Sequence, residues 1–125
     1  MSQIASNVID VPVLEGAVGQ PIDRAHLTRM TLGDRSLERE VLQLFERQAE
    51  MLLERMSEVE AASVPALAHT LKGSARGIGA WNVARAAEAL ELADGAAAEF
   101  EAAKRELAGT VAAARSIIAD LLRAH

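Results

Sequence analysis

The chain has 125 residues, enough for one domain that buries about two thirds of its unfolded surface. It has no cysteine, which excludes disulfide scaffolds, thiolate metal sites and thiol nucleophiles. A formal charge of −5, with the 13 Lys and Arg residues scattered along the chain, argues against a nucleic-acid partner. The apolar residues are mostly Ala and Leu with few aromatics, a composition that favours helices over sheets.

Residues 1–20 contain Pro12, Gly16 and Gly19 among short apolar runs that lack helical spacing. They are predicted to form an N-terminal arm of extended chain. The segment has neither a cationic start nor an uninterrupted apolar block, so it predicts no signal peptide and no membrane span. We therefore expect a cytoplasmic protein with one helical domain over residues 21–125.

Five helices are predicted beyond the arm, because the apolar residues recur there at helical intervals. The first is short, about residues 23–32, with Asp23 as its N-cap and Gly33 ending it. Leu27 and Met30 are expected to face inward. The second follows at once and extends to about residue 60, with a predicted core stripe of Leu37, Val41, Leu44, Phe45, Gln48, Met51, Leu52 and Val59.

The last two helices are predicted at about residues 80–94 and 97–123, with a break at Asp94 and Gly95. Tight connections between long helices favour antiparallel neighbours. The predicted fold class is therefore all-α, an up-and-down antiparallel four-helix bundle with a short additional N-terminal helix. The rows expected to face the core are Val83, Ala87 and Leu90 in the first of these two helices, and Phe100, Leu107, Val111, Ala114, Ile118 and Leu121 in the second.

The third helix contains the most informative residues. It is predicted to begin at the cap Ser63 and to end at Gly77 and Gly79, which can adopt left-handed backbone geometry. On the helical wheel, three apolar residues lie within about 20° of the direction opposite His69. If these residues face the core, His69 must face solvent. They are Leu67, Leu71 and Ile78.

Lys72, Gly73 and Arg76 lie within about 60° of His69 on the same helix face. A neutral imidazole offers a ring-nitrogen lone pair to an electrophilic phosphorus without a general base. The phosphorylated ring would have about two negative charges, which the mobile ammonium of Lys72 can stabilise. Glycine inside a helix costs about 1 kcal/mol against alanine, but Gly73 leaves room beside the ring. The pattern predicts that His69 accepts a phosphoryl group.

A resemblance to the histidine phosphotransfer domains rests on His69-x-Leu71-Lys72-Gly73-Ser74-Ala75, followed by Gly79-Ala80. It extends over about residues 22–123, and Ala75 stands where many members have Ser. The resemblance implies a four-helix bundle that is phosphorylated on the histidine ring and exchanges phosphate with aspartates of receiver domains. It also implies no cofactor and no resident metal, because the receiver brings the magnesium.

The function expected from these observations is that of a phosphorelay carrier, in which His69 is the phosphoacceptor, Lys72 stabilises the phosphoryl group and Gly73 gives access. One alternative is a catalytically silent helical adaptor for receivers or kinases, which would need neither His69 nor Lys72. Another is the phosphoacceptor part of a sensor kinase, where an acidic residue normally follows the histidine; here Thr70 follows. Autophosphorylation from ATP is not expected, because no nucleotide-binding segment is found.

The residues expected to contact a partner lie around His69. They are Ala68, Thr70 and Arg76 of the third helix and Gln48 of the second. The expected partner is a receiver domain of a response regulator or hybrid kinase, bound by a monomer of this chain. Trp81 is a further candidate for a partner surface. The other histidines, His26 and His125, have no partner at metal-ligand spacing, so no metal site is predicted.

Overall fold

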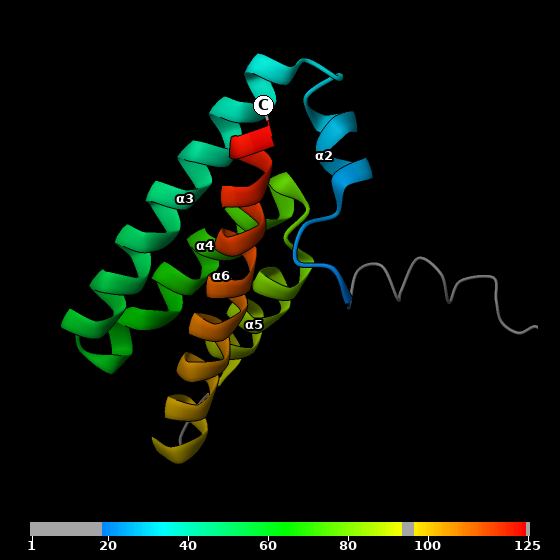
Figure 1. The fold of residues 1–125 in the computed structure, drawn as a ribbon. Helices are drawn as coiled ribbons and strands as arrows, with labels where there is room; N and C mark the ends of the chain where they lie inside the picture. Colours follow the sequence, from blue (N-terminus) through cyan, green and yellow to red (C-terminus); the bar gives the residue numbers. More distant parts are fainter. Residues whose placement is uncertain (1–18, 94–96, 125) are drawn as a thin grey trace, which may run out of the picture.

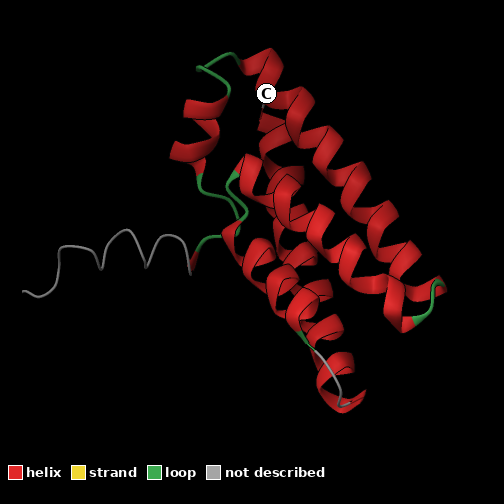
Figure 2. Cartoon of the chain, turned by 180° about the vertical axis from the view of Figure 1, so that it is seen from behind, coloured by secondary structure: helices red, strands yellow, loops and turns green. Residues whose placement is uncertain are grey.

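The structure, a computed structural model, describes residues 19–93 and 97–124 (Figures 1 and 2). No strand occurs within these residues, which confirms the all-α prediction. The predicted arm lies outside them except for Gly19 and Gln20, as do the predicted break at Asp94 and Gly95 and the terminal His125. The elements are α2 (Arg24–Met30), α3 (Arg35–Glu58), the 3₁₀ turn η2 (Ala61–Ser63), α4 (Val64–Ile78), α5 (Trp81–Leu92) and α6 (Ala97–Ala124).

The four long helices pack in a ring, in which α3 and α5 each contact both α4 and α6. In Figure 1 the colours run down α3, up α4, down α5 and up α6, the course expected of an up-and-down bundle. The short helix α2 packs on α4. Every predicted helix is found with its ends within two residues of the expected positions. None of the described helices is both long and apolar enough to cross a membrane.

The core is formed by one buried row from each long helix, as the 3.6-residue period requires. The rows predicted for α5 and α6 are buried, with Phe100 packed at the edge of the core. In α2, Leu27 is buried as predicted. The largest fully buried side chains are Phe45, Ile22, Leu27, Leu42, Leu71, Leu90, Leu107 and Ile118.

The buried row of α3 differs from the predicted stripe. The residues that face the core are Leu42, Phe45, Ala49, Leu52 and Met56. The prediction was wrong for Leu37, Leu44 and Met51, which are exposed, and for Met30 of α2, which is also exposed. Apolar residues occupy two faces of α3, and periodicity alone does not decide which face meets the other helices. Met30 and Leu44 instead line a shallow hollow between α2, α3 and α4.

Gly79 forms the corner at which α4 ends and the start of α2 is held. Its φ of 80° is left-handed, and a Cβ atom built on it would lie 2.9 Å from the backbone oxygen of Asp23. The backbone nitrogen of Asp23 donates to the Gly79 carbonyl at 2.9 Å, and the Asp23 side chain caps α2. Gly77 was predicted to share in ending the helix, which is wrong, because it lies inside α4 without a positive φ.

A matched pair of glycine substitutions tests this corner. Gly79→Ala should lower the free energy of unfolding by about 1 to 3 kcal/mol, because it combines a left-handed φ with contact against the Asp23 backbone. Gly77→Ala should raise it by up to about 1 kcal/mol, because Gly77 is helical and faces open space. Urea unfolding of both variants measures the difference, and equal stabilities would contradict the role given to Gly79.

Candidate functional site

His69 faces solvent because the opposite side of α4 is part of the core. Leu71 and Ile78 are buried, and Leu67 packs against the core as a partly buried residue. The His69 side chain is 66% exposed, which confirms the orientation predicted from the helical wheel. The ring is therefore anchored on a rigid helix and open to an approaching protein.

A carboxylate from α5 holds the imidazole. His69 Nδ1 lies 2.8 Å from Oε2 of Glu91, and the Nζ atom of Lys72 lies 2.8 Å from Oε1 of the same carboxylate. A carboxylate oxygen only accepts hydrogen bonds, so Nδ1 is the nitrogen that has the proton. In the neutral ring this leaves the lone pair on Nε2. The three side chains form one cluster, the His69–Glu91–Lys72 site.

The charge of Glu91 is stabilised by its neighbours. The Lys72 ammonium is the main cause of a lowered pKa for the Glu91 carboxyl, burial partly opposes this effect, and the hydrogen bond from His69 adds to it. The Oε1 atom is buried and has no hydrogen bond of standard geometry, so the ion pair with Lys72 compensates its charge. The carboxylate therefore stays ionised at neutral pH.

Lys72 is less free than the sequence suggested. Its side chain was expected to be a mobile cation on the exposed face, but it is only 13% exposed and is paired with Glu91. Glu91 was not among the site residues predicted from the sequence. Glu91 is 22 residues from His69, and no local pattern joins the two positions.

Three other residues predicted for the site, Gly73, Thr70 and Arg76, are exposed on α4. Gly73 is exposed, and a Cβ atom added to it meets no atom within 4 Å. The surface of α4 one turn beyond His69 is therefore open. Thr70 is exposed and its hydroxyl donates to the Ala66 carbonyl at 3.2 Å. Arg76 is exposed, with Nη2 3.8 Å from Oε1 of Glu88. These positions surround His69 on one face of α4.

Gln48 is hydrogen-bonded to a neighbouring helix, and Ala68 is buried in the bundle. The Oε1 atom of Gln48 accepts a hydrogen bond from Ser74 Oγ at 2.6 Å, which joins α3 to α4 beside the site. Ala68 is fully buried, so its side chain cannot reach a docked protein. Its prediction as a partner contact is therefore corrected, because position 68 points into the bundle one residue before His69 points out of it.

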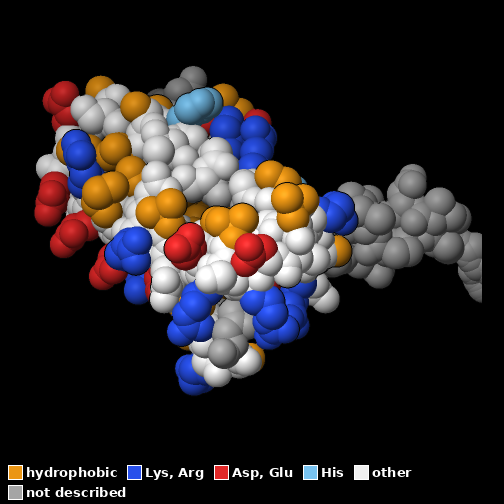
Figure 3. Space-filling view, turned by 90° about the horizontal axis from the view of Figure 1, so that it is seen from above, with side chains coloured by type: hydrophobic (Ala, Val, Ile, Leu, Met, Phe, Trp, Pro, Cys, Tyr) orange, Lys and Arg blue, Asp and Glu red, His pale blue; other side chains and the backbone are white. Residues whose placement is uncertain are grey.

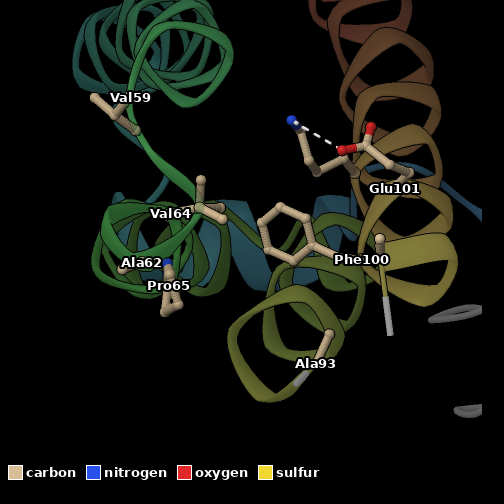
Figure 4. A pocket seen from close by; sticks show the side chains of 10 residues that line it. Val59, Ala62, Val64, Pro65, Ala93, Phe100 and Glu101 are labelled. Carbon is tan, nitrogen blue, oxygen red and sulfur yellow. Dashed lines mark ion pairs between the residues drawn. The ribbon is translucent and has the colours of Figure 1, made fainter. Parts of the chain in front are cut away.

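A separate hollow of about 560 Å³ lies between η2, α4 and α6 (Figure 4). Figure 4 shows the ring of Phe100 in this hollow, with Val64 and Pro65 opposite. Lys104 pairs with Glu101 at 3.7 Å and lies 5.5 Å from the Phe100 ring centre. His69, Lys72 and Glu91 are not among its lining residues, so the hollow is distinct from the His69–Glu91–Lys72 site.

Comparison with known proteins identifies one family. The family model of the Hpt domain matches residues 40–123, about two thirds of the chain. The match covers α4, α5 and most of α3 and α6, and it includes every residue of the His69–Glu91–Lys72 site. Neither the curated proteins nor the solved structures contained a match.

The lowered pKa of Glu91 predicts how its substitution affects stability at different pH values. A carboxyl whose folded pKa lies below its ordinary value of 4.5 stabilises the fold above that pH, and this contribution is lost as pH falls through the folded pKa. The difference in unfolding free energy between wild type and Glu91→Gln should therefore be largest at neutral pH and shrink in acid below pH 4.5.

Urea unfolding at a series of pH values measures this difference. Glu106→Gln is the matched control, because Glu106 is exposed and has no ion pair within residues 19–93 and 97–124. A stability difference for Glu91→Gln that stays constant down to strong acid would contradict the ion pair with Lys72.

Proposed function

Because the chain belongs to the Hpt domain family, we propose that it is a phosphorelay carrier whose His69 accepts a phosphoryl group from a receiver aspartyl phosphate and passes it to another receiver. Histidine phosphotransfer in phosphorelays is the activity that this family implies. The observation that supports the assignment to His69 is the exposed ring whose Nδ1 is engaged by Glu91, which leaves the Nε2 lone pair for phosphorus.

The proposed transfer needs no general base. The Nε2 atom of His69 attacks phosphorus, and the N–P bond forms while the P–O bond to the receiver aspartate breaks. The aspartate leaves as a carboxylate with the electron pair of that bond. The ring keeps its proton on Nδ1 and becomes cationic, and the carboxylate of Glu91 offsets this charge from 2.8 Å. Positioning and charge neutralisation supply the rate, and the reverse step passes the group onward.

Lys72 has two tasks in this proposal. It holds the Glu91 carboxylate in place, and as a cation on the next turn of α4 it offsets part of the negative charge that a phosphoryl group on His69 would add. Gly73 leaves the adjoining turn of α4 without a side chain, so that the phosphoryl group and its donor can approach closely. The chain is proposed to act as a cytoplasmic monomer.

The receiver is proposed to dock on the face formed by α3 and α4. Thr70, Arg76 and Gln48 remain candidates for contacts there, joined by the exposed side chains of Leu44 and Met51. Apolar groups within a polar rim are the usual anatomy of such an interface. Figure 3 shows apolar side chains in patches between charged ones on the face seen from above.

Labelled phospho-receiver tests the function directly. Wild type should take up label that is stable in alkali and labile in acid, as expected of a phosphohistidine, and His69→Gln should take up none. His26→Gln serves as the control and should keep the label, since it leaves His69 in place. Equal labelling of wild type and His69→Gln would discard the proposal, and absence of label in wild type with intact binding would favour the silent adaptor.

Two glycine variants distinguish the access of the phosphoryl group to His69 from the stability of the fold. Gly73→Ala should raise the unfolding free energy by up to about 1 kcal/mol, yet slow phosphotransfer by about tenfold or more, because the methyl group enters the space that the phosphoryl group needs. Gly109→Ala in α6 meets equally open space and should give a similar gain in stability at an unchanged transfer rate. Single-turnover transfer and urea unfolding measure both quantities, and unchanged transfer in Gly73→Ala would remove Gly73 from the site.

A further inference from the structure

A second hollow, of about 420 Å³, lies where α2, α4 and α5 meet. We call it the arginine pocket, because three arginines line it. Trp81 and Ala84 contribute apolar surface, and two carboxylates complete the lining. The charged residues are Arg29, Arg76, Arg85, Asp23 and Glu88.

The two carboxylates do not balance the three guanidinium groups. Asp23 is engaged by the fold, since Oδ1 accepts from the His26 backbone nitrogen at 3.1 Å and Oδ2 accepts from Trp81 Nε1 at 2.9 Å. Glu88 has one long contact, 3.8 Å from Nη2 of Arg76. Within the part of the chain that the structure describes, Arg29 and Arg85 have no carboxylate at ion-pair distance; Arg29 interacts with the Asp23 charge only at longer range, and Arg85 donates to Asn82. The pocket is thus locally cationic in a chain whose net charge is −5.

The pocket is also preorganised. The Trp81 indole is half-buried, its nitrogen is bonded to Asp23, and its ring packs edge-on against His26 with 4.8 Å between ring centres. His26 Nε2 lies 3.0 Å from the Arg76 carbonyl. These contacts fix α2 against the corner between α4 and α5, so a ligand meets a formed cavity and little ordering entropy is lost on binding.

The pocket continues the face that contains His69. Arg76 is seven residues beyond His69 on α4, a distance of about 10 Å along the helix. On α5, Glu88 precedes Glu91 by three residues and is its neighbour on the helix surface, and Arg85 in turn precedes Glu88 by three residues. A protein domain that docks over His69 on α4 is large enough to contact the arginine pocket on the α5 side of α4 as well as the α3 side, since an ordinary interface buries about 800 Å² per partner.

We propose that the arginine pocket binds acidic side chains of the receiver domain that docks on His69, and that it selects among receivers by charge. This inference rests on the proposed function. Charge complementarity beside an interface speeds association and rejects partners with the wrong sign. The occupant is a carboxylate-bearing surface segment of the receiver, roughly 10 Å from the phosphorylated aspartate, because Arg76 lies about that far from His69 along α4.

Binding of purified receiver domains to the full chain, measured by calorimetry at low and high salt, tests the proposal. For receivers that bind, Arg29→Gln combined with Arg85→Gln should raise Kd about tenfold and flatten its salt dependence. Arg105→Gln is the matched control, since Arg105 is exposed on α6 outside the pocket, and it should change Kd less than about twofold. Circular dichroism should show unchanged helix content in all variants. Neutralising the acidic residues of the receiver should cause no further loss in the double variant.

Several results would overturn the proposal. An unchanged Kd and salt dependence in the double variant would show that the pocket takes no part in docking. The chain's own residues 1–18, which contain Asp10 and Glu15 and no Lys or Arg, are the competing occupant. Tighter receiver binding by Asp10→Asn combined with Glu15→Gln would assign the pocket to them. If receivers bind wild type and His69→Gln equally but wild type takes up no phosphoryl label, the proposed function fails and the docking proposal still stands. If no receiver binds wild type, both fail.

Discussion

The close packing of α4 against α5 is the constraint on which the site depends. The contact between these two helices is the most extensive in the fold. Small residues are fully buried on both, among them Ala68 and Ala75 on α4 and Ala87 on α5. Small side chains at a helix contact allow the axes to approach closely. The approach brings Glu91 within 2.8 Å of both His69 and Lys72, so the chemistry of an exposed histidine is set by a buried helix contact.

Local periodicity was sufficient for the parts of the fold that depend on near neighbours. The ends of the helices follow from caps and glycines such as Asp23 and Gly79, whose effect is confined to one turn. The outward direction of His69 follows from the strongly apolar side of α4 opposite to it. Both are properties of a single helix, and a sequence pattern is able to predict them.

Contacts between helices determine two features that the periodicity of a single helix does not predict: which face of α3 is buried, and the contact of Glu91 with His69. On α3, Leu44 and Met51 looked like core residues, but the row containing Leu42 and Phe45 is the one that faces the other helices. Glu91 was not predicted for the site, because its contact with His69 exists only once α5 lies beside α4. The two errors have the same origin: each residue's surroundings are set by a neighbouring helix. The mispredicted Leu44 and Met51 of α3 are exposed apolar side chains on the proposed docking face.

In the proposed transfer, a carboxylate beside His69 is unfavourable by itself, because the Glu91 carboxylate and the phosphoryl group would both be anionic. The arrangement of the site resolves this difficulty. Glu91 contacts Nδ1, on the side of the ring away from the attacking Nε2, and its other oxygen is already paired with Lys72. In the proposed mechanism the carboxylate would therefore stabilise the cationic ring over 2.8 Å, whereas its repulsion of the phosphoryl group would be reduced by the ammonium paired with it. Removal of Lys72 would leave that repulsion uncompensated, so in the proposed mechanism the lysine serves the carboxylate as much as the phosphoryl group.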